Sequence, residues 1–122
     1  MVVAVQRLCD AEPCVILSGQ SLSAAVDLGG RVLCGIAFPA AWTAAGITFQ
    51  GSTTLAGTYV DLYTETAEIS ATSAAASRYV GLDSSYFFGI NFLKVRSGTS
   101  AAAVAQGADR TLQLLIGRPS VS

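Results

Sequence analysis

The amino-acid sequence predicts an all-β protein, a single antiparallel β-sandwich of about eight or nine short strands in a jelly-roll-like arrangement. Three observations lead to this fold class. Apolar and polar residues alternate along several short segments, as they do on strands with one buried face. Glycine, serine and aspartate residues separate these segments at short spacing. Residues 71–76 are rich in alanine, but this segment is shorter than an isolated helix requires and carries no apolar stripe.

The first half of the chain contains four predicted strands, at residues 13–17, 21–28, 31–38 and 47–51. Gly29-Gly30 joins the second and third of these strands and predicts a two-residue hairpin turn, because such turns need positive φ angles. The third strand has apolar residues on both faces, so we expect other elements to cover it on both sides.

A corner containing the only tryptophan, Trp42, separates the third and fourth strands. Pro39 ends the preceding strand, and a run of small residues follows before the next strand begins. A buried indole covers a large apolar area, so this position predicts a pin between two sheets. The residues expected to pin the core are all aromatic: Trp42, Phe49, Phe88 and Phe92.

The second half adds predicted strands at residues 58–64, 77–82, 86–96 and 110–117, with a weaker one around Ile69. Residues 86–96 form the longest strand pattern in the chain, and apolar residues on both of its faces are typical of a central strand. Several side chains of the other strands are expected to point into the core: Val60, Leu62, Leu112, Leu114 and Ile116.

The sandwich domain is expected to span residues 13–119, with a tail at 120–122. Residues 1–12 lie outside the clean strand pattern, and two interpretations remain open: an arm that contacts a neighbouring subunit, or an edge strand. The candidate contact residues of this segment are Val2, Val3, Val5 and Arg7. Its apolar run is too short for a signal peptide, and no longer apolar run could span a bilayer. We therefore expect folding in a cytoplasm and no membrane partner.

The composition indicates a surface that other chains cover. Hydrophobic residues make up 52% of the 122 residues, and the mean hydropathy is +0.53. Charged residues make up 12%, about half the usual share, whereas a soluble monomer normally carries more charge on its surface. The net charge is −1 and no basic face is present, which argues against direct binding of nucleic acid.

The chain lacks the residues of common catalytic sites. It contains no histidine, which excludes Ser-His-Asp and Cys-His arrangements. Asp61, Glu65 and Glu68 could act as paired carboxylates, but the preferred interpretation is a solvated acidic edge. No phosphate-binding glycine motif and no EF-hand spacing is present. We therefore predict that the protein is not an enzyme and uses no cofactor or metal.

The cysteines Cys9, Cys14 and Cys34 are odd in number and irregular in spacing, and no histidine is present to complete a zinc site with them. The preferred interpretation is that they are small apolar residues. The alternative is a disulfide between Cys9 and Cys14, which would close a very small loop.

Three polar residues stand out because both arginines among them border strands in a chain with few charges: Arg96, Gln106 and Arg110. Two interpretations remain open. The arginines could meet carbonyl or carboxylate groups across an interface, as a lock between subunits. Alternatively, the three residues could tie down a loop of their own domain.

Four tyrosines allow a further pair of interpretations. They could form an aromatic platform for a sugar ring, or they could pack in the core and at interfaces. These residues are Tyr59, Tyr63, Tyr79 and Tyr86.

Several motifs together resemble a known group of proteins: Gly19–Ser23, Pro39–Ala45, Ile47–Ser52, Leu93–Thr99 and Gln106–Arg110. As a set they are similar to small β-sandwich virion proteins of tailed bacteriophages and gene transfer agents. The resemblance covers about residues 18–118. It implies a capsid decoration (cement) protein that binds the outer capsid surface and bridges neighbouring major capsid proteins.

The same resemblance implies the expected partners and location. The partner is the major capsid protein, and the chain forms a homo-oligomer, with a trimer favoured. It is made in the host cytoplasm and resides on the virion, at the capsid surface. The alternative function is that of a carbohydrate-binding module of a head fibre or tail spike, with a host glycan as its partner.

Overall fold

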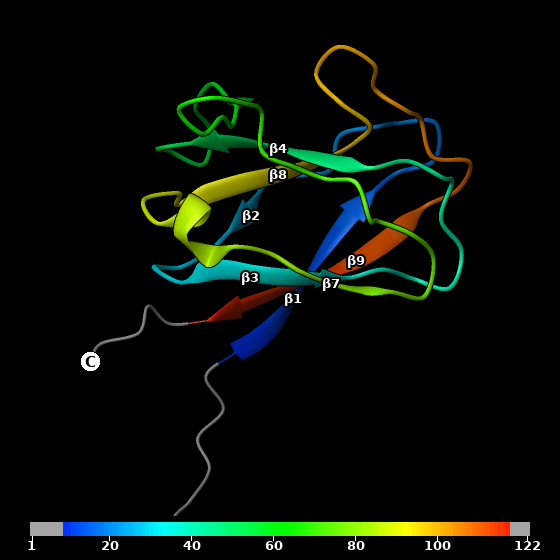
Figure 1. The fold of residues 1–122 in the computed structure, drawn as a ribbon, viewed down its shortest axis with the longest axis horizontal. Helices are drawn as coiled ribbons and strands as arrows, with labels where there is room; N and C mark the ends of the chain where they lie inside the picture. The colour runs from blue at the N-terminus through cyan, green and yellow to red at the C-terminus, as the bar shows by residue number, and fades with distance from the viewer. Residues whose placement is uncertain (1–8, 118–122) are drawn as a thin grey trace, which may run out of the picture.

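The computed structural model describes residues 9–117, without the side chain of Cys9, and the chain folds into two antiparallel sheets that face each other (Figure 1). The first sheet has the order β1 (Cys9–Ile16), β9 (Arg110–Gly117), β3 (Val32–Ala37) and β7 (Tyr79–Gly81). The second sheet has the order β2 (Val26–Asp27), β8 (Phe92–Ser97), β4 (Ile47–Ser52) and β5 (Val60–Asp61). The short β6 (Ser70–Ala71) pairs with the half of β4 that β5 leaves open. The predicted all-β antiparallel sandwich is confirmed.

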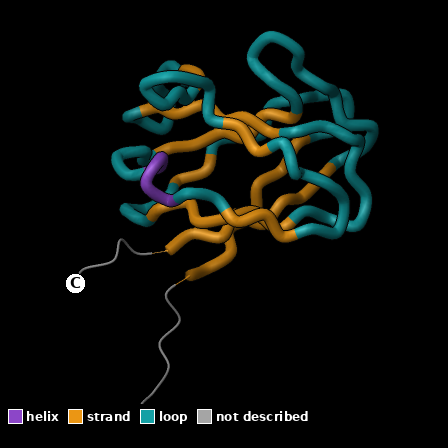
Figure 2. The backbone as a smooth tube through the Cα atoms, viewed as in Figure 1, coloured by secondary structure: helices purple, strands orange, loops and turns teal. Residues whose placement is uncertain are grey.

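The strands pair in a nested order along the chain. β1 pairs with β9, β2 with β8, β3 with β7 and β4 with β5, while β6 is an addition to this scheme. Successive pairs alternate between the two sheets: β1–β9 and β3–β7 lie in the first sheet, and β2–β8 and β4–β5 lie in the second. This is the jelly-roll arrangement of eight strands. Figure 2 shows that loops connect the strands at both ends of the sandwich.

The core lies between the inner faces of the two sheets. Leu112, Leu114 and Ile116 of β9 are fully buried, as the alternation of that strand predicts. Phe49 of β4 is also fully buried, and its ring meets the ring of Phe87 edge to face at 5.1 Å. Each such side chain stabilises the fold by about 1.5–3 kcal/mol relative to exposure.

The Gly29-Gly30 turn has the predicted geometry but a different place in the topology. Both glycines have positive φ angles, +61° and +77°, and the N–H of Arg31 donates to the carbonyl of Leu28 at 3.1 Å. The turn leads from β2 in the second sheet to β3 in the first, so the flanking strands do not pair. The prediction of a hairpin is therefore wrong, because β3 takes β9 and β7 as its neighbours.

The predicted strand at residues 86–96 is wrong in its first half. A short 3₁₀ helix, η1 (Ser84–Phe87), begins where the Asp83 carboxylate accepts from the N–H of Ser85, at 3.0 Å. Gly89 then adopts a φ of +88°, which an extended strand does not allow. This segment places Phe87 in the core and leaves Phe88 58% exposed, so the predicted role of Phe88 as a core pin is also wrong.

The corner with Trp42 carries the chain from β3 in the first sheet to β4 in the second. The indole is half-buried, packs edge-on against Phe38 at 5.0 Å and donates from Nε1 to the carbonyl of Ala45 at 3.1 Å. Trp42 therefore lies at the predicted switch between sheets. Phe92, the remaining residue predicted to pin the core, is half-buried on β8.

Two further strands are shorter than their sequence patterns predict. The segment 21–28 contributes only β2, and Ser23 is buried there while Ala24 is exposed. The Ser23 hydroxyl accepts from the N–H of Val95 at 2.9 Å, and the N–H of Ser23 donates to the carbonyl of Val95, also at 2.9 Å. The segment 58–64 contributes only β5, where Val60 is 60% exposed rather than inward.

The N-terminal region is described only in part. β1 begins at Cys9 and forms an edge of the first sheet, so it crosses the boundary predicted at residue 13. Val2, Val3, Val5 and Arg7 lie outside the described residues, as does the tail at 120–122. Across residues 9–117, no helix is long and apolar enough to cross a membrane.

Candidate functional site

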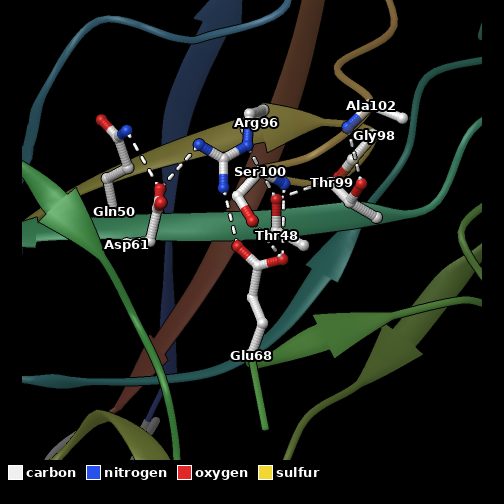
Figure 3. A network of polar contacts seen from close by, with 9 residues as sticks. All are labelled: Thr48, Gln50, Asp61, Glu68, Arg96, Gly98, Thr99, Ser100 and Ala102. Atoms are coloured by element: carbon white, nitrogen blue, oxygen red, sulfur yellow. Dashed lines mark hydrogen bonds and ion pairs between the residues drawn. The ribbon is translucent and has the colours of Figure 1, made fainter.

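Arg96 lies at the centre of a polar cluster on the second sheet (Figure 3). Its guanidinium donates from Nε to Thr48 Oγ1 at 3.0 Å, from Nη1 to Asp61 Oδ1 at 2.7 Å and from Nη2 to Glu68 Oε2 at 2.9 Å. The Arg96 side chain is buried, and so is the Thr48 hydroxyl. We call Arg96, Thr48, Asp61 and Glu68 the Arg96 cluster.

The sheet register explains why these side chains meet. Leu93 and Val95 of β8 point into the core, so Arg96 points to the outer face, directly opposite Thr48 on β4. Asp61 follows on β5, where the Gln50 side chain also donates to its Oδ1 at 3.2 Å. These hydrogen bonds, first from Arg96 and then from Gln50, lower the pKa of Asp61 below its ordinary value.

The Arg96 cluster also fastens a loop that projects from the sandwich at residues 98–104 (Figure 1). Glu68 Oε1 accepts from the hydroxyl of Ser100 at 3.0 Å and from its N–H at 3.3 Å. Thr48 Oγ1 donates to the carbonyl of Gly98 at 2.9 Å. The loop base is therefore bonded to β4 and to the segment between β5 and β6.

Gln106 and Arg110 form a second set of bonds, around the Trp42 corner. The fully buried Gln106 accepts from the N–H of Thr43 at 2.8 Å and from Arg110 Nε at 3.1 Å. It donates to the carbonyl of Thr43 at 3.1 Å and to Ser97 Oγ at 2.7 Å. One amide side chain therefore holds the corner, the end of β8 and the start of β9 together.

The structure answers the question that the sequence left open for Arg96, Gln106 and Arg110. All three bind groups of their own chain, which is the arrangement expected if they fasten loops of their own domain. Asp61 and Glu68 are ion-pair partners of Arg96 rather than a solvated acidic edge, so that interpretation is wrong for these two residues.

Cys14 is buried in the core, as its interpretation as a small apolar residue predicts. Cys14 is a free thiol in the core, so the alternative of a Cys9–Cys14 disulfide is wrong. Burial raises the pKa of the Cys14 thiol to about 11, which keeps it protonated. Within residues 9–117, there is no group of three or more cysteine, aspartate or glutamate residues that could hold a metal ion.

An apolar groove opens at the edge of the second sheet beside β5. It has a volume of about 340 Å³, and Gly51, Val60, Leu62 and Ile90 are among its lining residues. A Cβ on Gly51 would come within 2.9 Å of a Leu62 methyl carbon, so glycine allows this side chain to pack there. We call this feature the β5 groove.

Exposed apolar side chains flank the β5 groove. Val60 lines the groove and is 60% exposed, while the 58% exposed Phe88 lines a neighbouring pocket that shares Gly89 and Ile90 with the groove. Leu55 is 57% exposed and lies in the loop that contributes Thr53 and Thr58 to the lining. Sequence reasoning missed this surface, because it assigned Val60 and Phe88 to the core.

The four tyrosines do not share one element. Tyr59 is half-buried, donates to the carbonyl of Leu55 at 2.8 Å and lies under the Lys94 ammonium at 4.5 Å. Tyr63, Tyr79 and Tyr86 are exposed, after β5, on β7 and in η1. They therefore come from separate segments of both sheets.

Comparison with known protein families, with curated proteins and with solved structures finds no match to this chain. The class that the strand order defines is the antiparallel jelly-roll sandwich.

Proposed function

We propose that this chain is a structural virion protein that binds the outer surface of a tailed-phage capsid and bridges neighbouring major capsid proteins. The observation that carries the proposal is the group of exposed apolar side chains at the β5 groove, in a chain with only 12% charged residues. Large exposed apolar patches mark sites of contact with other proteins. The sequence resemblance supplies the identity of the partner.

The mechanism requires binding alone, with no catalysis and no cofactor. Val60, Phe88 and Leu55 would insert between capsid subunits and exclude water, at about 25 cal/mol for each Å² of apolar surface buried. Copies joined as a homo-oligomer, with a trimer favoured, would engage several capsid subunits at once. Linked sites of this kind raise the overall affinity by about 10²–10⁴.

The internal bonding of the polar residues supports this role. Arg96, Gln106 and Arg110 satisfy their hydrogen bonds within the domain, so they need no partner from the shell. They also hold the loops near the Trp42 corner and β8 in fixed positions. A preorganised surface loses less conformational entropy on binding. The chain would be made in the host cytoplasm and then reside on the virion.

Cosedimentation with capsids tests the proposal. Purified chain is mixed with mature capsids of the particle from the same genome, and separately with unassembled major capsid protein. We expect binding to capsids and not to the unassembled protein. The double variant Val60→Thr, Phe88→Ser should weaken capsid binding by at least about tenfold, since buried aromatic anchors dominate interfaces.

The control is Tyr79→Ser, which changes a more exposed aromatic residue on the other sheet and should bind as the unchanged chain does. Absence of capsid binding would overturn the proposed function. Equal binding by the double variant and the control would leave the function in place but exclude the β5 groove as the contact.

A further inference from the structure

A second groove lies where the edges of the two sheets approach each other. Its volume is about 270 Å³, and it is lined from the second sheet by β6 and the turn after it, and from the first sheet by the end of β7. Tyr86 and Phe87 of η1 complete the lining. β6 and β7 have only two and three residues, so this side of the sandwich is left open. We call it the β6–β7 groove.

The β6–β7 groove combines an apolar base with an exposed aromatic ring. Ile69, Val80 and Phe87 are buried and contribute apolar surface. Tyr86 also lines the groove but is about half exposed, so part of its ring is available to a ligand. Neither Tyr63 nor Tyr79 lines this groove.

Hydroxyl and carboxylate groups surround this apolar base. The residues that bring them are Ser70, Thr72, Ser73 and Asp83. The N–H and the hydroxyl of Ser85 both donate to Asp83 Oδ1, at 3.0 and 2.7 Å, which fixes the carboxylate. These bonds also lower the pKa of Asp83, so that it is an ionised acceptor at neutral pH.

The open edge of β7 adds backbone groups. The carbonyl of Arg78 accepts from the N–H of Phe38, the residue after β3, at 2.8 Å. The N–H of Leu82 donates to the carbonyl of Cys34 in β3 at 2.9 Å. Because backbone groups alternate in direction along an antiparallel strand, those of Gly81 point away from β3. Gly81 lines the groove, so it offers one donor and one acceptor there.

We propose that the β6–β7 groove is a binding site for a saccharide. A sugar ring has an apolar C–H face, which suits Tyr86, and a rim of hydroxyls that both donate and accept, which suits the serine, threonine and backbone groups. An anionic ligand would be repelled by Asp83, and a purely apolar ligand would leave these polar groups unpaired. The volume lies just below the usual range for small-molecule sites, about 300–1,000 Å³, and favours a single ring.

The saccharide site is independent of the proposed capsid contact. The residues that line the β6–β7 groove and those that line the β5 groove have no member in common. A chain attached to a shell through one groove could therefore bind a glycan through the other. Failure of either activity leaves the other unaffected, because each is measured on its own set of variants.

A glycan array probed with the full chain tests the inference, followed by titration calorimetry with the sugars that bind. Tyr86→Ala should weaken binding by about tenfold or more, which corresponds to about 1.4 kcal/mol. Tyr86→Phe keeps the ring face and should stay within about threefold of the unchanged chain. Tyr63→Ala is the matched control and should have no effect, because Tyr63 is 59% exposed, against 48% for Tyr86, but lies outside the groove.

The variant Asp83→Asn tests whether the carboxylate contributes to sugar binding independently of its contribution to folding. An asparagine oxygen can still accept from Ser85 and cap η1, so melting temperature should hardly change while sugar affinity falls. Thermal melting of every variant shows whether it is folded. The inference is overturned if no sugar on the array binds, or if folded Tyr86→Ala binds as well as the Tyr63→Ala control.

Discussion

The two residues of β5 have opposite environments. Asp61 binds Arg96 at 2.7 Å in the Arg96 cluster, whereas its neighbour Val60 is 60% exposed beside the β5 groove. In most sandwiches the charges face water and the apolar side chains are buried. Here Asp61 and Arg96 fasten the domain internally, and the apolar side chain of Val60 remains at the surface. That division is expected of a domain whose surface is covered in an assembly.

Among the changes that test this comparison, replacing the buried arginine should have the largest effect on stability. In Arg96→Met, the carboxylates of Asp61 and Glu68 lose their cation, and the Thr48 hydroxyl loses its donor. We expect the free energy of unfolding to fall by about 2–4 kcal/mol, less than for a fully buried pair because Asp61 keeps some contact with water. Urea denaturation followed by tryptophan fluorescence measures this change.

Arg31 provides the matched control, because it also meets two carboxylates, those of Asp10 and Glu12, at 3.1 and 3.6 Å. Its side chain is 27% exposed, against 9% for Arg96, and its partners are more exposed too. Arg31→Met should therefore cost about 1 kcal/mol or less. Equal losses for the two variants would show that burial of the Arg96 cluster does not set its contribution.

A smaller change in stability is expected when the pH is lowered, because Asp61 becomes protonated. Its folded pKa lies below the ordinary value of 3.8, so the unfolded chain binds a proton first as the pH falls. The contribution of Asp61 is therefore complete above about pH 5 and is lost as the pH falls through 3.8 toward the folded value. Partial exposure of the carboxylate keeps this contribution modest.

Thermal melting of the unchanged chain and of Asp61→Asn, from about pH 7 to about pH 2.5, measures this effect. The unchanged chain should be the more stable at neutral pH, and the difference should shrink below about pH 4. A difference that stays constant across this range would show that the Asp61 charge contributes nothing to the Arg96 cluster.

The fold was predictable where its causes are local. β9 was located correctly because alternation along residues 110–117 directly reports one buried face. The segment 84–91 was not, because its alternation competes with two local signals, the Asp83 cap and the positive φ of Gly89. Both signals are present in the sequence, but a repeating apolar pattern does not show which of them prevails.

The polar cluster was predictable only in parts. Arg96 was identified as a residue of interest, and Asp61 and Glu68 as two of three neighbouring acidic residues, but the sequence did not connect them. They lie 35 and 28 residues from Arg96, and they meet it only because β8, β4 and β5 are neighbours in one sheet. Strand order between distant segments depends on the whole fold, so local patterns do not contain it.

The smallest effect on stability is expected from replacing exposed apolar side chains, and it tests the difference between Val60 and Asp61 most directly. The double variant Val60→Thr, Phe88→Ser should change the free energy of unfolding by no more than about 0.5 kcal/mol, since exposed side chains lose little when they become polar. The same denaturation measurement applies, with Phe49→Ala as the buried reference, expected to cost about 3–5 kcal/mol. A large loss for the double variant would mean that these side chains support the core. A neutral result means that folding does not explain their apolar character, as the proposed contact with another molecule requires.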